Sequence, residues 1–366
     1  MKVCFVIESM FNSGGMENVL SCCASALSSD IDVSILTLYQ NKQKYFFPLS
    51  ENIRCYDLSL NDIRDKRVLQ KKIKSFFLVH QFDIVVSLGG IDMYYLHSIK
   101  DGSKKVVWFH FAHNVAYTAW LGDSSSFIKK IKGYLLQAKR IYNARKYDTI
   151  VAISSADKKA WKKYTRNVVL IHNPLTISHP VVSQRKTKTV VSVGRLDFAK
   201  GFDLLINAWK LVSKQHSDWI LNIYGDGELR EPLQEQINKL NLSDTIILQG
   251  RKSNIGEIYS QHSFYVMSSR SEALGLVLIE AAACGLPLIA YDCPFGPKDI
   301  IKDGKNGFLV KKVGDIEGMA EAINKLIENQ ELRDKMGEKA LLMVDRFSLS
   351  KITIQWHNLF KTLASM

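Results

Sequence analysis

Residues 264–291, F-Y-V-M-S-S-R-S-E-A-L-G-L-V-L-I-E-A-A-A-C-G-L-P-L-I-A-Y, hold two short apolar segments with a helix-forming run between them. The first and the last six residues have the length and composition of buried strands, and the alanine- and leucine-rich run has those of a helix. This order predicts a βαβ unit with two parallel strands. Glu272 and Glu280 interrupt the apolar stretch. Since a buried carboxylate without a partner is costly, either both lie at exposed ends of these elements or a polar group meets them.

The same alternation of apolar strands and helical segments continues along the chain and predicts two parallel sheets. A first series of strands is expected at residues 2–7, 33–38, 83–88, 105–110 and 149–154. It closes at Asn173-Pro174, and the polar residues 178–188 that follow have the character of a linker. A second series is expected at residues 189–194, 219–225, 245–250, 264–269 and 286–291. We therefore expect an α/β protein with two Rossmann-like, doubly wound domains, at 1–175 and 176–345, facing across a ligand-binding cleft.

The composition is that of an ordinary soluble globular protein. The 366 residues are 46% hydrophobic and 23% charged, and no apolar run reaches the roughly 18 residues that a transmembrane helix needs. The start, M-K-V-C-F-V-I-E-S-M, contains an acid too early for a signal peptide and is typical of a first strand. The six cysteines have no C-x-x-C spacing, which favours reduced thiols and a cytoplasmic location.

The formal net charge of +13 is concentrated in one segment. Residues 127–146, F-I-K-K-I-K-G-Y-L-L-Q-A-K-R-I-Y-N-A-R-K, carry seven basic residues and no acid. Apolar residues recur in this segment at helical spacing: Phe127, Ile128, Ile131, Leu135, Ile141 and Tyr142. This pattern predicts a basic amphipathic helix, which is common on anionic membrane surfaces. A solvated helix packed on its own domain fits the pattern equally well.

Two loops in the second half have the composition of phosphate-binding turns. In V-S-V-G-R-L-D-F-A-K-G, Gly194 ends a strand, and Arg195 and Lys200 precede a helix. Two cations near a helix N-terminus suit a pyrophosphate, although an exposed turn with basic residues is an equal alternative. The G-x-G at 225–227 also follows a strand, but it lacks the third glycine of a dinucleotide fingerprint.

The position of the two glutamates within the 264–291 unit predicts a ligand between them. A helix is expected to start near Leu274 or Gly275, and its free N–H groups and dipole favour a phosphate. Glu280 then lies about one and a half turns into the helix, within reach of a ribose. Glu272 precedes the phosphate site and can address the group beyond the diphosphate. One carboxylate per sugar, with a pyrophosphate between them, predicts a sugar nucleotide.

Together these motifs closely resemble those of the retaining family 4 glycosyltransferases of GT-B fold. The resemblance in the second domain rests on Glu272/Glu280 as E-x7-E, on Gly194, Arg195 and Lys200, on the G-x-G at 225–227, and on D-x-x-x-G-P-x-D-I-I-x-x-G-x-N-G-F-L-V at 292–310. The first domain adds Ser13, Gly14, Gly15 and W-F-H at 108–110. Asp299 stands where the family usually carries glutamate, and we expect this shorter acid to cap the following helix.

The resemblance implies roles for the matching residues of the second domain. Arg195 and Lys200, beside Gly194, would bind the diphosphate, and Glu272 would touch the donor sugar. Glu280 would hold the ribose hydroxyls, and the helix N-terminus at Leu274, Gly275 and Leu276 would stabilise the leaving group.

In the first domain the resemblance assigns Gly14 and Gly15 to the donor phosphate or the acceptor. It places His110 beside the donor sugar, with His113 as an alternative. The two histidines of H-F-A-H lack a third metal ligand, and catalysis without metal is the norm of the family, so neither a metal nor a cofactor is expected.

The hypothesis is a retaining glycosyltransferase that moves a hexosyl or hexosaminyl unit from a nucleoside diphosphate sugar, with UDP as the expected nucleotide, to a saccharide acceptor. D-C-P-F-G-P-K-D-I-I (292–301) is similar to the corresponding segment of bacterial enzymes that build surface polysaccharides, such as lipopolysaccharide or capsule, on lipid carriers. A lipid-linked acceptor at the inner face of the cytoplasmic membrane is therefore expected. The first domain would be the acceptor side, and residues 346–366 would form a helix that crosses back to it.

Two alternatives remain open: a GT-B-fold nucleotide-sugar epimerase, and a catalytically silent scaffold that binds membrane or polysaccharide. The intact motif residues disfavour the scaffold. Nucleic acid is not an expected partner, because the basic run lacks interleaved stacking aromatics in a recognisable module.

Overall fold

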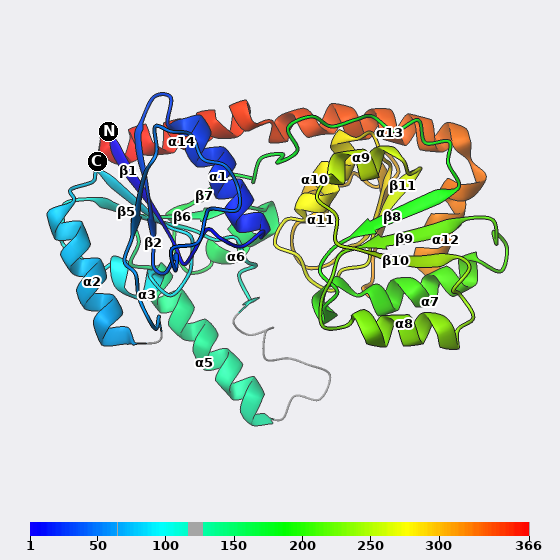
Figure 1. The fold of residues 1–366 in the computed structure, drawn as a ribbon, viewed down its shortest axis with the longest axis horizontal. Helices are drawn as coiled ribbons and strands as arrows, with labels where there is room; N and C mark the ends of the chain where they lie inside the picture. The colour runs from blue at the N-terminus through cyan, green and yellow to red at the C-terminus, as the bar shows by residue number, and fades with distance from the viewer. Residues whose placement is uncertain (64, 116–126, 366) are drawn as a thin grey trace. The chain divides into compact units, whose positions relative to one another are not determined.

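The computed structural model describes residues 1–63, 65–115 and 127–365 and divides the chain into two compact units. Unit 1 comprises Met1–Pro174 together with Leu349–Met366, and unit 2 comprises Leu175–Ser348. In each unit, helices cover both faces of one parallel sheet (Figure 1). The predicted α/β architecture with two parallel sheets is confirmed.

Sheet A of unit 1 has seven strands in the order β3-β2-β1-β4-β5-β6-β7, paired in parallel. Its strands are β1 (Lys2–Ile7), β2 (Asp32–Thr37), β3 (Arg54–Asp57), β4 (Ile84–Ser87), β5 (Lys104–Trp108), β6 (Thr149–Ala152) and β7 (Val168–Leu170). Strands that are covered on both faces read as continuous apolar runs, which is why the sequence predicts the central ones. The edge strand β3, R-C-Y-D, is largely exposed and has no such run, so the sequence did not predict it.

The helices of unit 1 divide between the two faces of sheet A. Cys4 and Val6 of β1 lie in the core beneath α2 (Lys66–Val79), α3 (Met93–Leu96) and α5 (Phe127–Ala144). Phe5, which points to the opposite face, contacts α14 (Leu349–Ala364), and α1 (Gly15–Leu27) packs beside α14. The remaining helix, α6 (Ser155–Trp161), packs against β6 and β7.

The C-terminal helix α14 completes the core of unit 1, although the whole of unit 2 precedes it in the chain. Trp356 is fully buried, and its ring centroid lies 4.7 Å from that of Trp108 and 6.2 Å from that of Phe5. Burial of such a large aromatic side chain strongly favours the docked helix. Unit 1 therefore depends on residues at both ends of the sequence.

Sheet B of unit 2 has six strands in the order β10-β9-β8-β11-β12-β13, also paired in parallel. Its strands are β8 (Thr189–Val193), β9 (Ile220–Tyr224), β10 (Ile246–Gly250), β11 (Phe264–Met267), β12 (Leu288–Tyr291) and β13 (Gly307–Val310). One face carries α7 (Phe202–Val212), α8 (Arg230–Lys239) and α12 (Ile316–Glu328), and the other carries α9 (Ile255–Ser260), α10 (Leu276–Ala283) and α13 (Gln330–Val344) (Figure 1). The shorter elements are η1 (Phe198–Lys200), α11 (Pro297–Ile300) and η2 (Asp345–Phe347).

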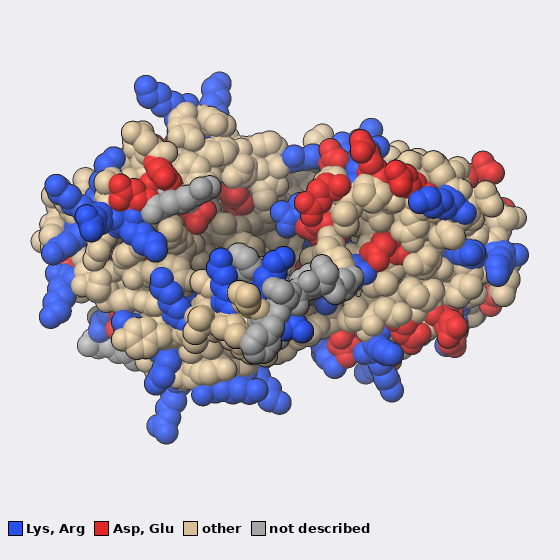
Figure 2. All heavy atoms as spheres, turned by 90° about the horizontal axis from the view of Figure 1, so that it is seen from below, with Lys and Arg blue, Asp and Glu red and all other residues tan. Residues whose placement is uncertain are grey.

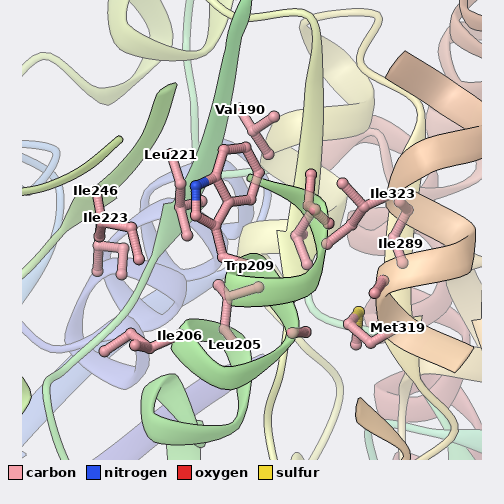
Figure 3. Packing of buried hydrophobic residues seen from close by; sticks show 14 of the residues in the cluster. Val190, Leu205, Ile206, Trp209, Leu221, Ile223, Ile246, Ile289, Met319 and Ile323 are labelled. Atoms are coloured by element: carbon pink, nitrogen blue, oxygen red, sulfur yellow. The ribbon is translucent and has the colours of Figure 1, made fainter. Parts of the chain in front are cut away.

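Trp209 of α7 lies in an apolar cluster of buried residues in unit 2. Its fully buried ring lies against Val190 and Leu221 of sheet B, and Met319 and Ile323 of α12 continue the cluster across the sheet (Figure 3). Apolar side chains fill this face of the sheet. We therefore expect polar binding residues of unit 2 at the ends of the strands and not on this face.

Residues 178–188 do not form the free linker that their polar composition predicted. Ser183 is buried; its N–H donates to the carbonyl oxygen of Cys284 at 2.9 Å and its hydroxyl donates to that of His262. Arg185 donates to the Asp334 carboxylate at 3.0 Å. The polar side chains of this segment therefore bind it to unit 2, which the sequence could not indicate.

Asp299 does not cap a helix. It lies within the first turn of α11, after the N-cap residue Gly296, so the expectation that it caps a following helix is wrong. Within the described ranges, no helix is both long enough and apolar enough to cross a membrane.

Trp356→Ala should lower the free energy of unfolding of unit 1 by about 3–5 kcal/mol, because it leaves a cavity beneath α14. Denaturant unfolding followed by circular dichroism measures this change. Ile354 lies on the same helix and is 57% exposed, so Ile354→Ala is the matched control and should change the free energy by less than about 0.5 kcal/mol. Equal effects of the two substitutions would show that α14 does not complete the core.

Candidate active site

Each sheet reverses its strand order at one place, between β1 and β4 in sheet A and between β8 and β11 in sheet B. In sheet B, the helix after β8 lies on one face and the helix after β11 on the other, which is the arrangement at which open α/β sheets bind ligands, at the carboxyl ends of the strands. Hydrogen bonds join these loops: Ser268 donates to the carbonyl oxygen of Lys200 at 3.0 Å, and Arg270 N–H donates to that of Ala199 at 2.7 Å. The structure thus brings together the two sequence motifs of the second domain.

Lys200 and Glu272 form an ion pair at this junction. Lys200 Nζ lies 2.6 Å from Glu272 Oε1, which also accepts a hydrogen bond from the Ser269 hydroxyl at 2.7 Å. The side chains are only 23% and 9% exposed, so the pair is weakly screened by water. The aliphatic part of the Lys200 side chain lies against Gly194. A Cβ at Gly194 would be 3.4 Å from Cγ and Cδ of Lys200. Glu272 therefore has partners within the protein, which the sequence did not identify.

Arg195 lies at the outer rim of the same loop. Its side chain is 77% exposed, and Nε donates to Asp197 at 2.6 Å. Asp197 in turn accepts a hydrogen bond from the backbone N–H of Lys200 at 3.1 Å and so caps η1. Arg195 is thus tied to the loop by its neighbour and remains accessible to a ligand.

The N-terminus of α10 supplies further positive potential. Gly275 is the N-cap, with φ of 89° in the left-handed region that favours glycine, and the first turn contains no acid. The first N–H groups of a helix have no partner within it and attract anions. Leu274 before the helix is buried, and Leu276 begins it. Leu274, Gly275 and Leu276 therefore occupy the predicted helix start.

Glu280 is held by two hydroxyl groups. Thr176 donates to Oε1 at 2.9 Å, and Tyr259 donates to Oε2 at 3.4 Å. Burial raises the pKa of Glu280, and these two hydrogen bonds counteract part of that increase. Neither hydroxyl was predicted, because Thr176 and Tyr259 are distant from Glu280 in sequence and carry no motif signal. The protein itself thus provides partners for both glutamates.

The G-x-G at 225–227 has a packing role. Gly225 has a φ of 142°, and a Cβ at this position would overlap the carbonyl oxygen of Gly194. A Cβ at Gly227 would lie too close to the carbonyl oxygen of Leu196. The turn after β9 therefore lies backbone to backbone against the turn after β8. This contact shapes the loop that carries Arg195 and Lys200.

In sheet A, the place where the strand order reverses, which we call the switch point, lies between β1 and β4 and carries carboxylates. Gly14 is the N-cap of α1 and Gly15 its first residue, but the Glu17 carboxylate folds back over Gly14. Glu8 follows β1 directly and accepts a hydrogen bond from the backbone N–H of Ile91 at 3.3 Å. Negative charge here disfavours binding of the donor phosphate, the first of the two roles predicted for Gly14 and Gly15. It is compatible with the second role, binding of the acceptor.

Asp92 lies in the same region and is fully buried. Its carboxylate and that of Glu8 both lie beside Gly90, where a Cβ would be 3.0 and 3.1 Å from their oxygens. Burial raises the pKa of Asp92 to about 7. Glu8, Glu17 and Asp92 were not predicted as site residues. The position of Glu8 directly after the first strand could have indicated it.

His110 and His113, which the sequence left as alternatives, have different environments. The ring of His110 packs against Trp108 in a tilted arrangement, with ring centroids 4.2 Å apart, and its buried Nε2 has no hydrogen-bond partner among the described residues. Burial lowers the pKa of His110 to about 3, so the ring is neutral at physiological pH. His113 is built into the fold: its backbone N–H donates to Asp157 at 2.6 Å, and its ring stacks on Tyr164. Nε2 of His113 is likewise buried without a hydrogen-bond partner among the described residues, so hydrogen-bonding capacity does not separate the two histidines; only His113 is fixed to the fold by its backbone and by Tyr164.

In the ranges that the structure describes, no three His, Cys, Asp or Glu side chains form a group that could hold a metal ion.

Comparison with known proteins identifies a family for most of unit 2 and relatives for the whole chain. Residues 176–343 match the family model described as glycosyl transferases group 1. An uncharacterized glycosyltransferase of Haemophilus influenzae is 30% identical, over 97% of this chain and 98% of that protein. The amylovoran biosynthesis glycosyltransferase AmsD of Erwinia amylovora is 26% identical, over 98% of this chain and 99% of that protein.

A third relative comes from Campylobacter jejuni. It is the GalNAc-alpha-(1->4)-GalNAc-alpha-(1->3)-diNAcBac-PP-undecaprenol alpha-1,4-N-acetyl-D-galactosaminyltransferase, 25% identical over 97% of each chain.

Solved structures share the fold over the full length. The lipopolysaccharide outer core galactosyltransferase WaaB aligns with a TM-score of 0.78 and 21% identity, over 99% of each chain. HepE of Anabaena, in complex with UDP and glucose, aligns with a TM-score of 0.77 and 19% identity, over 100% of each chain. The family model, the full-length relatives and the GT-B fold agree, and this chain belongs to the glycosyltransferases described as glycosyl transferases group 1.

Proposed function

We propose that this glycosyltransferase moves a hexosyl or hexosaminyl unit from a UDP-sugar to a lipid-linked saccharide, with retention of the anomeric configuration. The observation that carries the proposal is the arrangement in unit 2 of Lys200, Glu272 and Glu280 around the N-terminus of α10. It combines a cation, a helix dipole and two carboxylates at one site, which suits a diphosphate between two sugars.

The nucleotide moiety is proposed to extend along α10. Glu280 lies four residues after Leu276, at the second turn, so a diphosphate at the helix N-terminus would place the ribose near its carboxylate. Thr176 and Tyr259 would orient that carboxylate toward the ribose hydroxyls. UDP as the nucleotide is supported by the complex of HepE with UDP and glucose.

The leaving group requires the largest stabilisation in this reaction. The bond between the anomeric carbon and the diphosphate oxygen breaks, and negative charge develops on that oxygen. Lys200, Arg195 and the N–H groups of α10 would stabilise this charge, and Glu272 would hold Lys200 in place and contact the sugar. The acceptor hydroxyl forms the new bond on the same face, and its proton passes to the leaving phosphate oxygen. This same-face substitution retains the configuration.

The acceptor is proposed to bind unit 1. Glu8 and Glu17 at the switch point of sheet A disfavour anions and can accept hydrogen bonds from sugar hydroxyls. The neutral His110 of the same unit, with its unused Nε2, can hydrogen-bond a sugar hydroxyl group. An acceptor on a lipid carrier is supported by the Campylobacter relative, whose name contains undecaprenol, and by the amylovoran enzyme. A place in bacterial surface polysaccharide synthesis, at the cytoplasmic face of the membrane, follows from this proposal.

Transfer should not require a metal ion, because Lys200, Arg195 and the helix N-terminus already offset the charge of the diphosphate. Activity of the purified enzyme is measured with a UDP-sugar before and after treatment with EDTA. We expect the rate to change by less than about twofold. Complete loss of activity that is restored by Mn²⁺ would overturn this assignment.

Arg195→Ala and Lys200→Ala should each lower turnover by at least about tenfold, since charge-assisted contacts are worth about 1.5–3 kcal/mol. Lys200→Ala also leaves Glu272 without its cation, so its free energy of unfolding is measured in parallel. Lys210→Ala, an exposed position on α7, is the control and should leave kcat unchanged. A normal kcat in Arg195→Ala would place the diphosphate away from this residue.

The two glutamates should separate by role. Glu280→Ala should weaken binding of free UDP by about tenfold in calorimetry, because one hydrogen-bond acceptor for the ribose is lost. Glu272→Ala should leave UDP affinity within about twofold while lowering transfer. Thr176→Val removes one of the hydroxyls that hold Glu280 and should weaken UDP binding by a smaller factor. If UDP binding depends more on Glu272 than on Glu280, the proposed order of the donor along α10 is reversed.

A further inference from the structure

Helix α5 packs on unit 1 through polar side chains. Gln137, Arg140 and Asn143 are all buried, at the three-residue spacing of one helix face. Gln137 donates to the carbonyl oxygen of His113 at 2.7 Å, and Arg140 donates to that of Ala112 at 3.0 Å. Asn143 shares a hydrogen bond of 2.9 Å with His97. Ala144 and Ile141 near the end of the helix also pack on the core, so the side that faces the protein is mixed, with three buried polar side chains.

The outer side of α5 carries large exposed apolar side chains. Ile128 is 77% exposed, Leu135 is 66% exposed and Tyr142 is 62% exposed, and Ile131 and Tyr134 are exposed as well. A helix on the surface of a globular protein normally has the opposite arrangement, with its apolar side toward the core. The exposed apolar side chains of α5 therefore need an explanation other than packing in unit 1.

Cations surround these exposed side chains. The exposed basic residues of this segment are Lys129, Lys130, Lys132, Lys139, Arg145 and Lys146, and residues 127–146 contain no acid. Helix α2 has the same character: it contains no acid, its exposed cations are Lys66, Arg67, Lys71, Lys72 and Lys74, and Leu78 and Val79 near its end are exposed.

Tertiary structure brings these two helices to one side of unit 1. The short helix α3 contacts both α2 and α5, and all three lie over the same face of sheet A. Viewed from that side, lysine and arginine side chains gather over α2 and α5 (Figure 2). Two helices that are distant in the sequence, at Lys66–Val79 and Phe127–Ala144, thus form one basic surface, which we call the α2–α5 face.

We propose that the α2–α5 face docks unit 1 on an anionic lipid membrane, with the apolar residues of α5 entering the headgroup region and the lysines of both helices contacting lipid phosphates. The negative charge of an anionic bilayer complements the two acid-free helices, although the exposed Asp65 caps the start of α2, and exposed apolar side chains gain by burial in a lipid interface but not in solution. A soluble polyanion such as nucleic acid would satisfy the cations only. The inference does not depend on which donor or acceptor the enzyme uses.

The test is sedimentation of the full-length protein, without donor or acceptor, with vesicles of phosphatidylcholine containing phosphatidylglycerol or of phosphatidylcholine alone. We expect binding to the anionic vesicles only, and release as salt is raised, because screening shortens the range of the attraction. The triple variant Lys129→Glu, Lys130→Glu, Lys132→Glu should lower the apparent affinity at least tenfold. Lys66→Glu, Lys71→Glu, Lys74→Glu on α2 should also lower it, which only the shared surface predicts.

Two further variants separate the explanations. Ile128→Ser with Leu135→Ser keeps the charge and should still weaken vesicle binding several-fold, because both side chains would enter the interface. The matched control is Lys214→Glu, Lys239→Glu, Lys339→Glu, which makes the same charge change at exposed positions of unit 2 and should leave vesicle binding unchanged.

Failure of wild-type protein to sediment with anionic vesicles would overturn the proposal, as would equal loss of binding in the unit 2 control. Unchanged binding of the serine variant, together with competition by DNA, would also overturn it and would indicate a general polyanion site. Transfer to a short soluble acceptor is measured for each variant; it should be preserved in the α5 triple variant, so loss of docking is distinguished from loss of catalysis.

Discussion

Parallel pairing of the first strand of each sheet with two neighbours is the constraint on which the rest of this structure depends. β1 lies between β2 and β4, and β8 lies between β9 and β11. Because parallel strands require crossover connections, most strands are followed by a helix that covers one face or the other; β2 and β3 are joined without one. In both sheets the helices on either side of the central pair leave to opposite faces, and the adjoining loops open at the carboxyl ends of the strands. Arg195, Lys200, Glu272 and the N-terminus of α10 lie on or next to these loops, whereas Glu280 lies within α10 and His110 follows β5.

The two switch points have opposite electrostatic character. In unit 2, Lys200, Arg195 and the N-terminus of α10 provide positive potential, and Glu272 balances Lys200 at 2.6 Å. In unit 1, Glu8, Glu17 and Asp92 provide carboxylates, and burial raises the pKa of both Glu17 and Asp92. A cationic site suits a diphosphate, and a carboxylate-rich one suits hydroxyl groups. This difference is a physical basis for assigning the donor to one unit and the acceptor to the other.

Helix α5 shows the limit of amphipathic pattern as a guide to packing. Its apolar residues recur at helical spacing, and such a pattern normally indicates the buried side. Gln137, Arg140 and Asn143 are buried instead, because the carbonyl oxygens of Ala112 and His113 and the ring of His97 offer them partners. The periodicity predicts that two sides exist, but it does not specify which side meets the protein. The hydrogen-bonding groups of the neighbouring loop decide the orientation.

The sequence by itself determined the elements whose signals are local. Central strands that are buried on both faces are continuous apolar runs, the start of α10 follows from Gly275, and the motif residues Arg195, Lys200, Glu272 and Glu280 stand at recognisable spacings. The family resemblance also predicted that the C-terminal helix returns to the first domain. Tertiary structure alone decided the strand order, the exposed edge strand β3, the packing of Trp356 against Trp108, and the hydroxyl partners of Glu280. Thr176 and Glu280 are 104 residues apart, and local preferences carry no information over that distance. Both residues belong to unit 2, and their contact exists only once that unit has folded, because the fold, and not the neighbouring residues, brings the two side chains together.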